Sequence, residues 1–229
     1  MKRSLPKSRL SCILLAAGMS KRMGAENKLL IEINGEPLIR RTTRLLLDYG
    51  MEEIIVVLGY QSEDVHAAIE DLPVSCVVNS DYERGQMTSV HAGLTALTRE
   101  TDGVMIFLAD LLLITADDIR DIHASYEHQD ANILVPQFQQ IRGNPIIFSP
   151  VQRDSILAGE KNLGCRKLIS NNPELVTVFE STNDHVICDL DTPESLILMS
   201  QRLGLPIGQY ASANISSREP DRARRSHHV

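Results

Sequence analysis

Apolar residues along the chain form short runs typical of strands, separated by stretches in which they recur every three or four positions, as in helices. The short runs predict strands at 11–16, 53–58, 74–79, 103–108, 131–136, 145–148, 175–179 and 185–190. The helical stretches fall between many of these runs. This alternation predicts an α/β fold with a mostly parallel sheet flanked by helices on both faces.

Residues with strong terminal preferences mark where the helices begin and end. Gly50 ends the first apolar stripe and Pro73 the second, while Thr115 and Thr192 are typical N-cap residues. Pro193 then fits the first helical position. The predicted helices are 38–49, 65–72, 88–98, 116–127 and one that starts at 193.

The composition indicates one large globular domain. The chain has 229 residues, 43% of them hydrophobic and 23% charged, and no apolar run long enough to span a membrane. We expect this domain to occupy 10–205, after a basic segment at 1–9 that lacks the features of a signal peptide. The polar stretch 208–229 predicts a disordered tail. A net charge of -7 argues against nucleic acid as a partner.

The cysteine pattern favours a cytoplasmic protein. Cys12, Cys76, Cys165 and Cys188 are far apart in the sequence, and three of them lie in strand-like runs. We therefore expect buried thiols. No close pair with zinc-ligand spacing is present in the sequence.

The segment 15–30, LAAGMSKRMGAENKLL, carries the strongest functional signal. Small residues, including Gly18, follow the first predicted strand, and Arg22 and Lys28 lie shortly after them. Backbone amides of such a loop can point at phosphate oxygens while the cations offset their charge, which suits a nucleoside triphosphate. The pattern is neither the loop of P-loop NTPases nor the glycine fingerprint of dinucleotide-binding folds.

Acidic residues follow two other predicted strands. Asp110 ends the apolar run 104–109, where packing does not explain a carboxylate and a Mg²⁺ ligand does, although a turn cap is the alternative. Asp189 and Asp191 alternate at the end of the last predicted strand, so both point to one side. We favour Asp191 as the second metal ligand, because it lies closer to the strand end, and consider Asp189 a surface carboxylate or a partner of a loop donor.

Ligands of parallel sheets bind at the carboxyl ends of the strands. This rule gathers the loops 16–28, 59–61, 109–114 and 190–192 at one edge. Gly85 and Ser89 could border a base or sugar, whereas Arg142 and Arg166 could meet an anionic substrate near glycines. The alternative for Arg142 is a simple turn, and the histidines are expected to be structural or exposed because none has convincing metal spacing.

At these residues the chain resembles the MobA-like nucleotidyltransferases, most closely the molybdenum cofactor cytidylyltransferases. The resemblance covers roughly 11–203. It rests on the segment 15–30, supported in family order by YERGQMTSVHAGL, FLADLLLIT, IRGNPIIFS, NLGCRKLI and CDLDTPESL. The resemblance implies a glycosyltransferase-A-like nucleotide-binding fold. It also implies an enzyme that transfers CMP from CTP to the terminal phosphate of molybdopterin, with Mg²⁺ or Mn²⁺ as cofactor and a recipient molybdoenzyme as a further partner.

The resemblance assigns roles to individual residues. Arg22, Lys28 and Asp110 would be catalytic, and Asp110 and Asp191 would hold the metal. The nucleotide site would comprise Leu15, Ala16, Ala17, Gly18, Arg22, Lys28, Gly59, Gly85 and Ser89. The acceptor site would comprise Arg142, Asn144 and Arg166.

Two positions bear on the choice of substrates. Cytidylyl members of the family tend to carry Leu-Ala-Ala-Gly and guanylyl members Leu-Ala-Gly-Gly, so Ala17 favours CTP, since its methyl group narrows the space beside the base. Leu111 and Leu112 replace the usual Gln-Pro or Met-Pro after the metal-binding aspartate. This departure removes a fixed backbone angle and leaves acceptor recognition open.

Three other functions remain open from the sequence. The same chemistry could use GTP or another phosphorylated acceptor. Some MobA-like chains are thought to bind flavin or nicotinamide and reduce a pigment-like substrate, although the retained Lys28 and Asp110 argue against this. A non-catalytic chaperone that carries the cofactor to a molybdoenzyme is the third.

Overall fold

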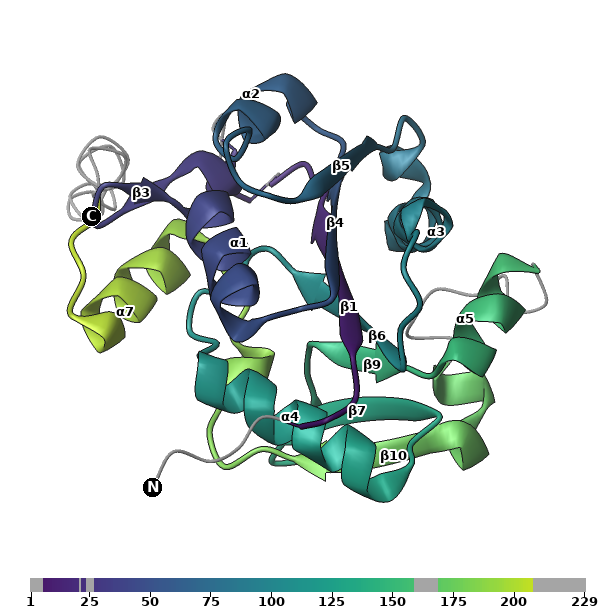
Figure 1. The fold of residues 1–229 in the computed structure, drawn as a ribbon. Coiled ribbons are helices and arrows are strands. Elements are labelled where there is room, and N and C mark those ends of the chain that lie inside the picture. Colours follow the sequence, from purple (N-terminus) through teal and green to yellow (C-terminus); the bar gives the residue numbers. More distant parts are fainter. Residues whose placement is uncertain (1–5, 21, 24–26, 159–168, 208–229) are drawn as a thin grey trace, which may run out of the picture.

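The computed structural model describes residues 6–20, 22–23, 27–158 and 169–207. Its centre is an eight-stranded sheet in the order β10-β7-β9-β6-β1-β4-β5, with β8 paired to β7 (Figure 1). These strands are β1 (Leu10–Ala16), β4 (Glu53–Leu58), β5 (Ser75–Val78), β6 (Gly103–Leu108), β7 (Ile133–Phe138), β8 (Ile141–Arg142), β9 (Ile146–Phe148) and β10 (Val176–Glu180). A small separate hairpin consists of β2 (Glu32–Ile33) and β3 (Glu36–Pro37).

The predicted mostly parallel sheet is confirmed. The central strand β1 pairs in parallel with β4 on one side and β6 on the other, and β5 and β10 also pair in parallel with their neighbours. The exceptions are β9, which runs antiparallel between β6 and β7, and the short β8. The ends of β1, β4 and β6 therefore meet at one edge, where a ligand site is expected.

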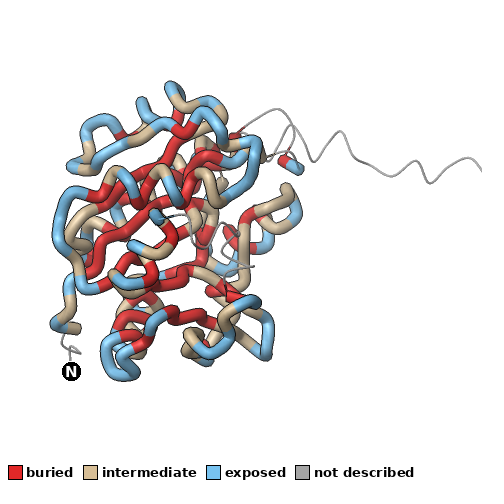
Figure 2. Tube along the Cα trace, turned by 90° about the vertical axis from the view of Figure 1, so that its right-hand side faces the viewer, coloured by how far each residue is buried: buried red, intermediate tan, exposed pale blue. Residues whose placement is uncertain are grey.

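Helices cover both faces of the sheet, as predicted (Figure 1). They are α1 (Leu38–Tyr49), α2 (Ser62–Ala67), α3 (Gln86–Ala96), α4 (Ala116–Gln129), α5 (Pro150–Leu157) and α7 (Pro193–Leu203), with 3-10 turns η1 (Lys28–Leu30), η2 (Tyr82–Arg84), η3 (Pro173–Leu175) and η4 (His185–Ile187). Alternate side chains of β1 supply two cores: Leu14 packs with residues of α1, α4 and α7, and Ile13 with residues of α3 and α5. Figure 2 shows this burial along the central strands.

The predicted helix boundaries hold where capping residues marked them. Gly50 ends α1 in the left-handed conformation, with a φ of 90°. Thr115 and Thr192 each form a capping box, with Asp118 and Ser195 respectively. The second helix differs from the prediction, because α2 is shorter and begins earlier, and the apolar positions up to Leu72 lie in turns.

The predicted strand at 185–190 is wrong. This segment contains the 3-10 turn η4 followed by irregular chain, in which Val186 and Leu190 are buried as separate anchors. A short apolar run does not by itself distinguish a strand from such a segment. The helix α5 and strands β2, β3 and β8 were not predicted.

The expected burial of the cysteines is only partly met. Cys12 is buried, but Cys76 is exposed on the edge strand β5 and Cys188 is half-buried. Cys165, Arg166 and the predicted tail 208–229 lie outside the described residues. None of the helices in the described part of the chain has the length and apolar character needed to cross a bilayer.

Candidate active site

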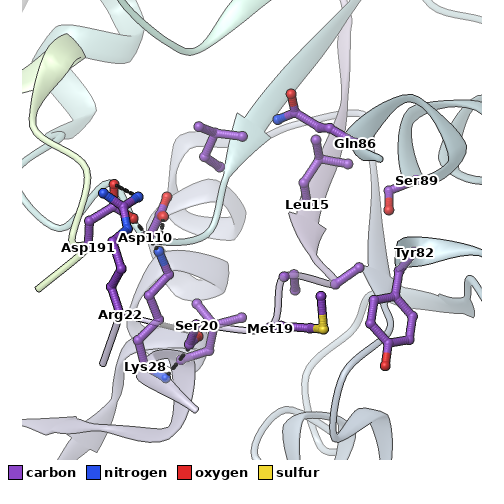
Figure 3. Close-up of a pocket in the computed structure, with 15 residues that line it drawn as sticks. Leu15, Met19, Ser20, Arg22, Lys28, Tyr82, Gln86, Ser89, Asp110 and Asp191 are labelled. Atoms are coloured by element: carbon purple, nitrogen blue, oxygen red, sulfur yellow. Dashed lines mark hydrogen bonds and ion pairs between the residues drawn. The ribbon is translucent and has the colours of Figure 1, made fainter. Parts of the chain in front are cut away.

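A pocket of about 500 Å³ lies at the carboxyl ends of β1 and β6. Figure 3 shows its two ends, with charged side chains gathered at one and mostly uncharged side chains at the other. Its lining residues are Leu15, Ala16, Ala17, Gly18, Met19, Ser20, Arg22, Lys28, Leu29, Tyr82, Gln86, Ser89, Leu108, Asp110 and Asp191. The predicted glycine loop and both predicted metal ligands thus line one cavity.

The loop after β1 is shaped by local contacts that orient Lys28. Ser20 has a φ of 50°, an uncommon conformation for a residue with a side chain, and its hydroxyl accepts a hydrogen bond from the Lys28 amide over 3.3 Å. Asn27 caps η1 by accepting from the Leu29 amide over 3.1 Å. A side chain added at Gly18 would meet open space, so the backbone here is accessible from the pocket.

The charged end of the pocket is an alternating cluster of cations and carboxylates. Lys28 Nζ donates to Asp110 Oδ2 over 2.5 Å and to Asp191 Oδ1 over 3.1 Å. Arg22 donates to Asp191 Oδ2 over 2.6 Å, and its side chain remains 69% exposed. Lys28 is 12% exposed. The four residues therefore form one ion-pair network that is deep at Lys28 and open to solvent at Arg22.

Electrostatics keep Lys28 charged and disfavour charge on Asp189. Burial alone would lower the pKa of Lys28, but the charge and hydrogen bonds of Asp110, and then of Asp191, raise it overall. Burial, followed by the charges of Asp110 and Asp191, raises the pKa of Asp189 to about 6. Asp189 is therefore no ordinary surface carboxylate, contrary to one of the two readings that the sequence allowed.

Unfilled carboxylate oxygens indicate that the cluster fits a divalent ion. Oδ1 of Asp110 and Oδ1 of Asp189 are buried and accept no hydrogen bond within the described part of the chain. Among these residues, no three acidic, histidine or cysteine side chains already surround one point. Mg²⁺ typically takes one or two protein carboxylates and completes its shell with substrate phosphates and water. The donor set therefore fits an ion that binds together with a triphosphate.

The other end of the pocket has the size and chemistry for a nucleoside. Tyr82, Gln86 and Ser89 face it from η2 and α3, opposite Leu15 (Figure 3). The Asn79 side chain donates to the hydroxyl of Ser89 over 2.9 Å and thereby fixes it. Met19, Ser20, Leu29, Tyr82, Gln86 and Leu108 line the pocket without having been assigned from the sequence. For most of them, the only signal in the sequence was that they lie next to residues already assigned to the site.

Two predicted nucleotide-site glycines shape the pocket from outside its lining. A Cβ atom at Gly59 would lie 2.7 Å from the Ala17 Cβ and 2.9 Å from the Tyr82 ring, so only glycine allows these two lining residues their positions. Gly85 has a φ of 121°, which favours glycine, at the start of α3.

Of the three predicted acceptor residues, the two that the structure describes lie outside the lining of this pocket. Neither Arg142 nor Asn144 is among its lining residues. The Asn144 amide instead donates to the Val186 carbonyl over 2.8 Å, and a Cβ atom at Gly143 would lie 2.3 Å from the same oxygen. This turn therefore supports the segment that leads to Asp189 and Asp191.

Leu111 and Leu112 also lie outside the nucleotide pocket. They are 2% and 4% exposed and pack into the core beside α1 and α4. They border a second cavity of about 370 Å³, which Arg41 and Thr42 also line. The two leucines that depart from the family pattern thus pack beneath the loop, while Asp110 itself faces the nucleotide pocket (Figure 3).

This chain belongs to the MobA-like NTP transferase domain family, whose model matches residues 12–177. The family therefore confirms the resemblance seen in the sequence, and nucleotidyltransferase is the class of protein that the fold and family define.

Three curated relatives cover most of the chain. The nicotine blue oxidoreductase of Paenarthrobacter nicotinovorans is 27% identical over 80% of this chain and 93% of its own. The molybdenum cofactor cytidylyltransferase of Escherichia coli is 26% identical over 85% and 97%, respectively. The molybdenum cofactor guanylyltransferase of Vibrio atlanticus is 30% identical over 81% and 93%.

Solved structures show the same fold. A nucleotidyl transferase from Methanothermobacter thermautotroptrophicus has a TM-score of 0.71 at 21% identity, covering 85% of this chain and 97% of its own. A protein from Mycobacterium tuberculosis H37Rv, solved as a complex with manganese, has a TM-score of 0.68 at 20% identity, covering 85% and 98%. At these identities the likeness concerns the fold, which is of the glycosyltransferase-A-like nucleotidyltransferase type.

Proposed function

We propose that this nucleotidyltransferase transfers CMP from CTP to the terminal phosphate of molybdopterin and releases pyrophosphate. One observation carries the proposal: a pocket of about 500 Å³ has an uncharged end beside Tyr82 and Gln86 and a cluster of Lys28, Asp110 and Asp191 at the other. This polarity matches a nucleoside at one end and a metal-bound triphosphate at the other.

The reaction is a displacement at the α-phosphorus of CTP. An oxygen of the acceptor phosphate forms the new P–O bond while the bond to pyrophosphate breaks on the opposite side. Since the nucleophile is already anionic, the protein supplies no general base. Its contribution is positioning and charge stabilisation.

Residues of the charged end would divide this work. Lys28, whose pKa is raised and which is therefore protonated near neutral pH, would move its contacts from carboxylates to phosphate oxygens. Arg22, at the open side, would hold the outer phosphates. Asp110 and Asp191 would hold Mg²⁺ or Mn²⁺, with Asp189 beside them. The ion, when bound, supplies charge neutralisation of the α-phosphate and of the leaving pyrophosphate.

Ala17 is the reason to place CTP ahead of GTP. Ala17 lines the pocket. Its methyl group packs against Gly59, where a Cβ atom would lie only 2.7 Å away. The relatives named above include both a cytidylyl and a guanylyl enzyme at similar identity, so the overall likeness favours neither nucleotide. The variant Ala17→Gly should lower the ratio of CTP to GTP turnover.

The function is tested by measuring pyrophosphate release from CTP, GTP, ATP and UTP, with and without molybdopterin and Mg²⁺. The proposal expects release only with both molybdopterin and the metal, and fastest with CTP. Faster release with GTP would retain the chemistry and overturn the choice of nucleotide. Release that is independent of molybdopterin would overturn the acceptor.

A second candidate function comes from one relative. The nicotine blue oxidoreductase suggests that a chain of this family can reduce a pigment-like substrate, which here would use NAD(P)H. The same purified protein separates the two functions, because consumption of NAD(P)H without pyrophosphate release favours the oxidoreductase. Molybdopterin binding without either reaction would favour a chaperone that delivers the cofactor to a molybdoenzyme.

Within this proposal the enzyme works in the cytoplasm. Cys12, Cys76 and Cys188 are free thiols, as is usual in a reducing compartment.

A further inference from the structure

The segment that carries Asp189 and Asp191 has no strand to hold it. Between Ser181 and Asp191 the chain forms only the short turn η4 and irregular structure. Its end is joined to Asp110 by one backbone hydrogen bond, which the Leu190 amide donates to the Asp110 carbonyl over 3.1 Å. Other contacts must therefore fix where the two carboxylates lie.

Asp118, at the start of α4, makes one set of these contacts, and Arg202 of α7 makes another through Asp184. The Asp118 side chain is 10% exposed and accepts four hydrogen bonds. The Thr115 amide and hydroxyl donate over 2.8 and 2.7 Å, which belongs to the helix cap. The other two donors lie in the distant segment: Asn183 Nδ2 and His185 Nδ1, each at 2.8 Å.

The protonation of this cluster follows from its geometry. Burial alone would raise the pKa of Asp118, but the hydrogen bonds from Asn183, His185 and Thr115 lower it overall. An ionised carboxylate only accepts hydrogen bonds, so His185 carries a proton on Nδ1. Each bond to Asp118 is therefore charge-assisted and stronger than a neutral one.

The two halves of this cluster join the two segments that bear the site's carboxylates. Thr115 lies five residues after Asp110, at the end of the loop that leaves β6. His185 lies shortly before Asp189 in the irregular segment. One carboxylate thus connects the loop of Asp110 to the segment of Asp189 and Asp191, with no contact to the pocket itself.

We propose that Asp118 is a positioning residue that holds the segment of Asp189 and Asp191 at metal-binding distance from Asp110. This inference rests on the proposed function only in assuming that these carboxylates hold a divalent ion. Groups hydrogen-bonded directly to metal ligands typically contribute 10–100-fold to metal affinity. Asp118 acts through Asn183 and His185, so we expect an effect at the lower end of this range.

The alternative is that Asp118 serves only as a helix cap. That role accounts for the bonds with Thr115 but not for those with Asn183 and His185. The variant His185→Phe removes a bond to the distant segment and leaves the capping box intact, whereas Asp118→Asn weakens both. Asp117→Asn is the matched control, because Asp117 is adjacent, is 84% exposed and pairs with Arg120 in its own helix.

The test is Mn²⁺ binding by the full chain, followed by electron paramagnetic resonance, with and without CTP. We expect Asp118→Asn and His185→Phe to bind Mn²⁺ at least about 10-fold more weakly than the wild type. Asp117→Asn should bind as the wild type does. In the pyrophosphate assay, the half-saturating Mg²⁺ concentration should rise by a similar factor, while kcat at saturating Mg²⁺ stays within about threefold.

Each outcome bears on the proposal. A lowered kcat at every Mg²⁺ concentration with unchanged Mn²⁺ affinity would show a purely structural role and overturn it. Equal Mn²⁺ affinity in His185→Phe and the wild type would also overturn it. If the wild type binds Mn²⁺ but releases no pyrophosphate, the proposed function fails, and weaker Mn²⁺ binding in the two variants still supports the positioning role. A wild type that binds no Mn²⁺ overturns both.

Discussion

Lys28 Nζ lies 2.5 Å from Oδ2 of Asp110, although the two residues are 82 positions apart in the sequence. The pair joins the glycine loop after β1 to the end of β6. Both side chains are largely buried, so the ion pair is little screened by solvent. The lysine thus offsets the charge of Asp110 and, together with Arg22, that of Asp191.

The first prediction concerns the loss of that cation. Lys28→Met retains the length of the side chain but leaves Asp110 without its cation and Asp191 with only the exposed Arg22. Because one partner of a largely buried pair is removed, the free energy of unfolding at pH 8 should fall by about 3 kcal/mol in urea titrations. Pyrophosphate release should fall at least about 100-fold.

A surface pair supplies the control for this variant. Arg44→Met removes the exposed partner of Glu36 and should change stability by less than about 1 kcal/mol. Unaltered stability and activity in Lys28→Met would show that the lysine neither balances the carboxylates nor contacts the triphosphate.

The second prediction concerns the wall of the nucleotide pocket. A methyl group at Gly59 would approach both Ala17 and Tyr82 to less than 3.0 Å, so these two lining residues must shift. We expect Gly59→Ala to raise the KM for CTP about 10-fold, with a smaller change in kcat, because the clash lies outside the charged end. Steady-state kinetics with varied CTP measure this, and a KM equal to that of the wild type would contradict it.

The third prediction separates two roles for the turn at 142–144. If the turn supports the segment of Asp189 and Asp191, Gly143→Ala should raise the half-saturating Mg²⁺ concentration, because the added carbon collides with the Val186 carbonyl. If Arg142 binds the acceptor, Arg142→Ala should raise the KM for molybdopterin alone. Kinetics with metal and acceptor varied separately distinguish these effects, and a changed acceptor KM in Gly143→Ala at unchanged metal dependence would refute the supporting role.

The fourth prediction concerns stability at mildly acidic pH. His123 is 4% exposed, and its ring nitrogens contact Tyr49 OH and the Ser8 hydroxyl at 2.8 and 2.9 Å. Burial lowers the pKa of His123, against the opposing charge of Glu127. The unfolded chain therefore binds this proton at a higher pH than the folded protein does.

Protonation of His123 in the unfolded chain should lower the stability of the folded protein at mildly acidic pH. The contribution of His123 to stability is complete above the unfolded pKa, about 6.5, and is lost as the pH falls through the lowered pKa of the folded state. His123→Gln, which cannot titrate, should lose less stability than the wild type between pH 7.5 and 5 in urea titrations. Parallel pH profiles for the two proteins would contradict this.

The fold could be predicted from the sequence where its signals are local. The parallel sheet was predicted from apolar runs that form β1, β4 and β6 in the structure. The N-cap residues Thr115 and Thr192 marked the starts of two helices. The segment 185–190 failed because its buried residues, Val186 and Leu190, occupy the core singly rather than along a strand. Long-range contacts with Asp118 and Gly143 decide its course, and a single sequence does not reveal them.

The sequence named the charged residues that line the pocket, but only some of the residues at its uncharged end. Arg22, Lys28, Asp110 and Asp191 line one pocket because strand ends of a parallel sheet meet at one edge. Tyr82 and Gln86 were not assigned, since a single aromatic ring or amide side chain has no distinctive spacing. Asp189 was ranked second for the metal because Asp191 lies closer to the predicted strand end, whereas the burial that raises the pKa of Asp189 depends on tertiary packing.

The most direct test of the central claim is the stoichiometry of products from CTP, molybdopterin and Mg²⁺. Mass spectrometry should find a CMP–molybdopterin adduct in a one-to-one ratio with pyrophosphate for the wild type, and neither product above background for Asp110→Asn. Equal product formation by Asp110→Asn would remove this carboxylate from the reaction. A wild type that consumes NAD(P)H and forms no adduct would contradict nucleotidyl transfer altogether.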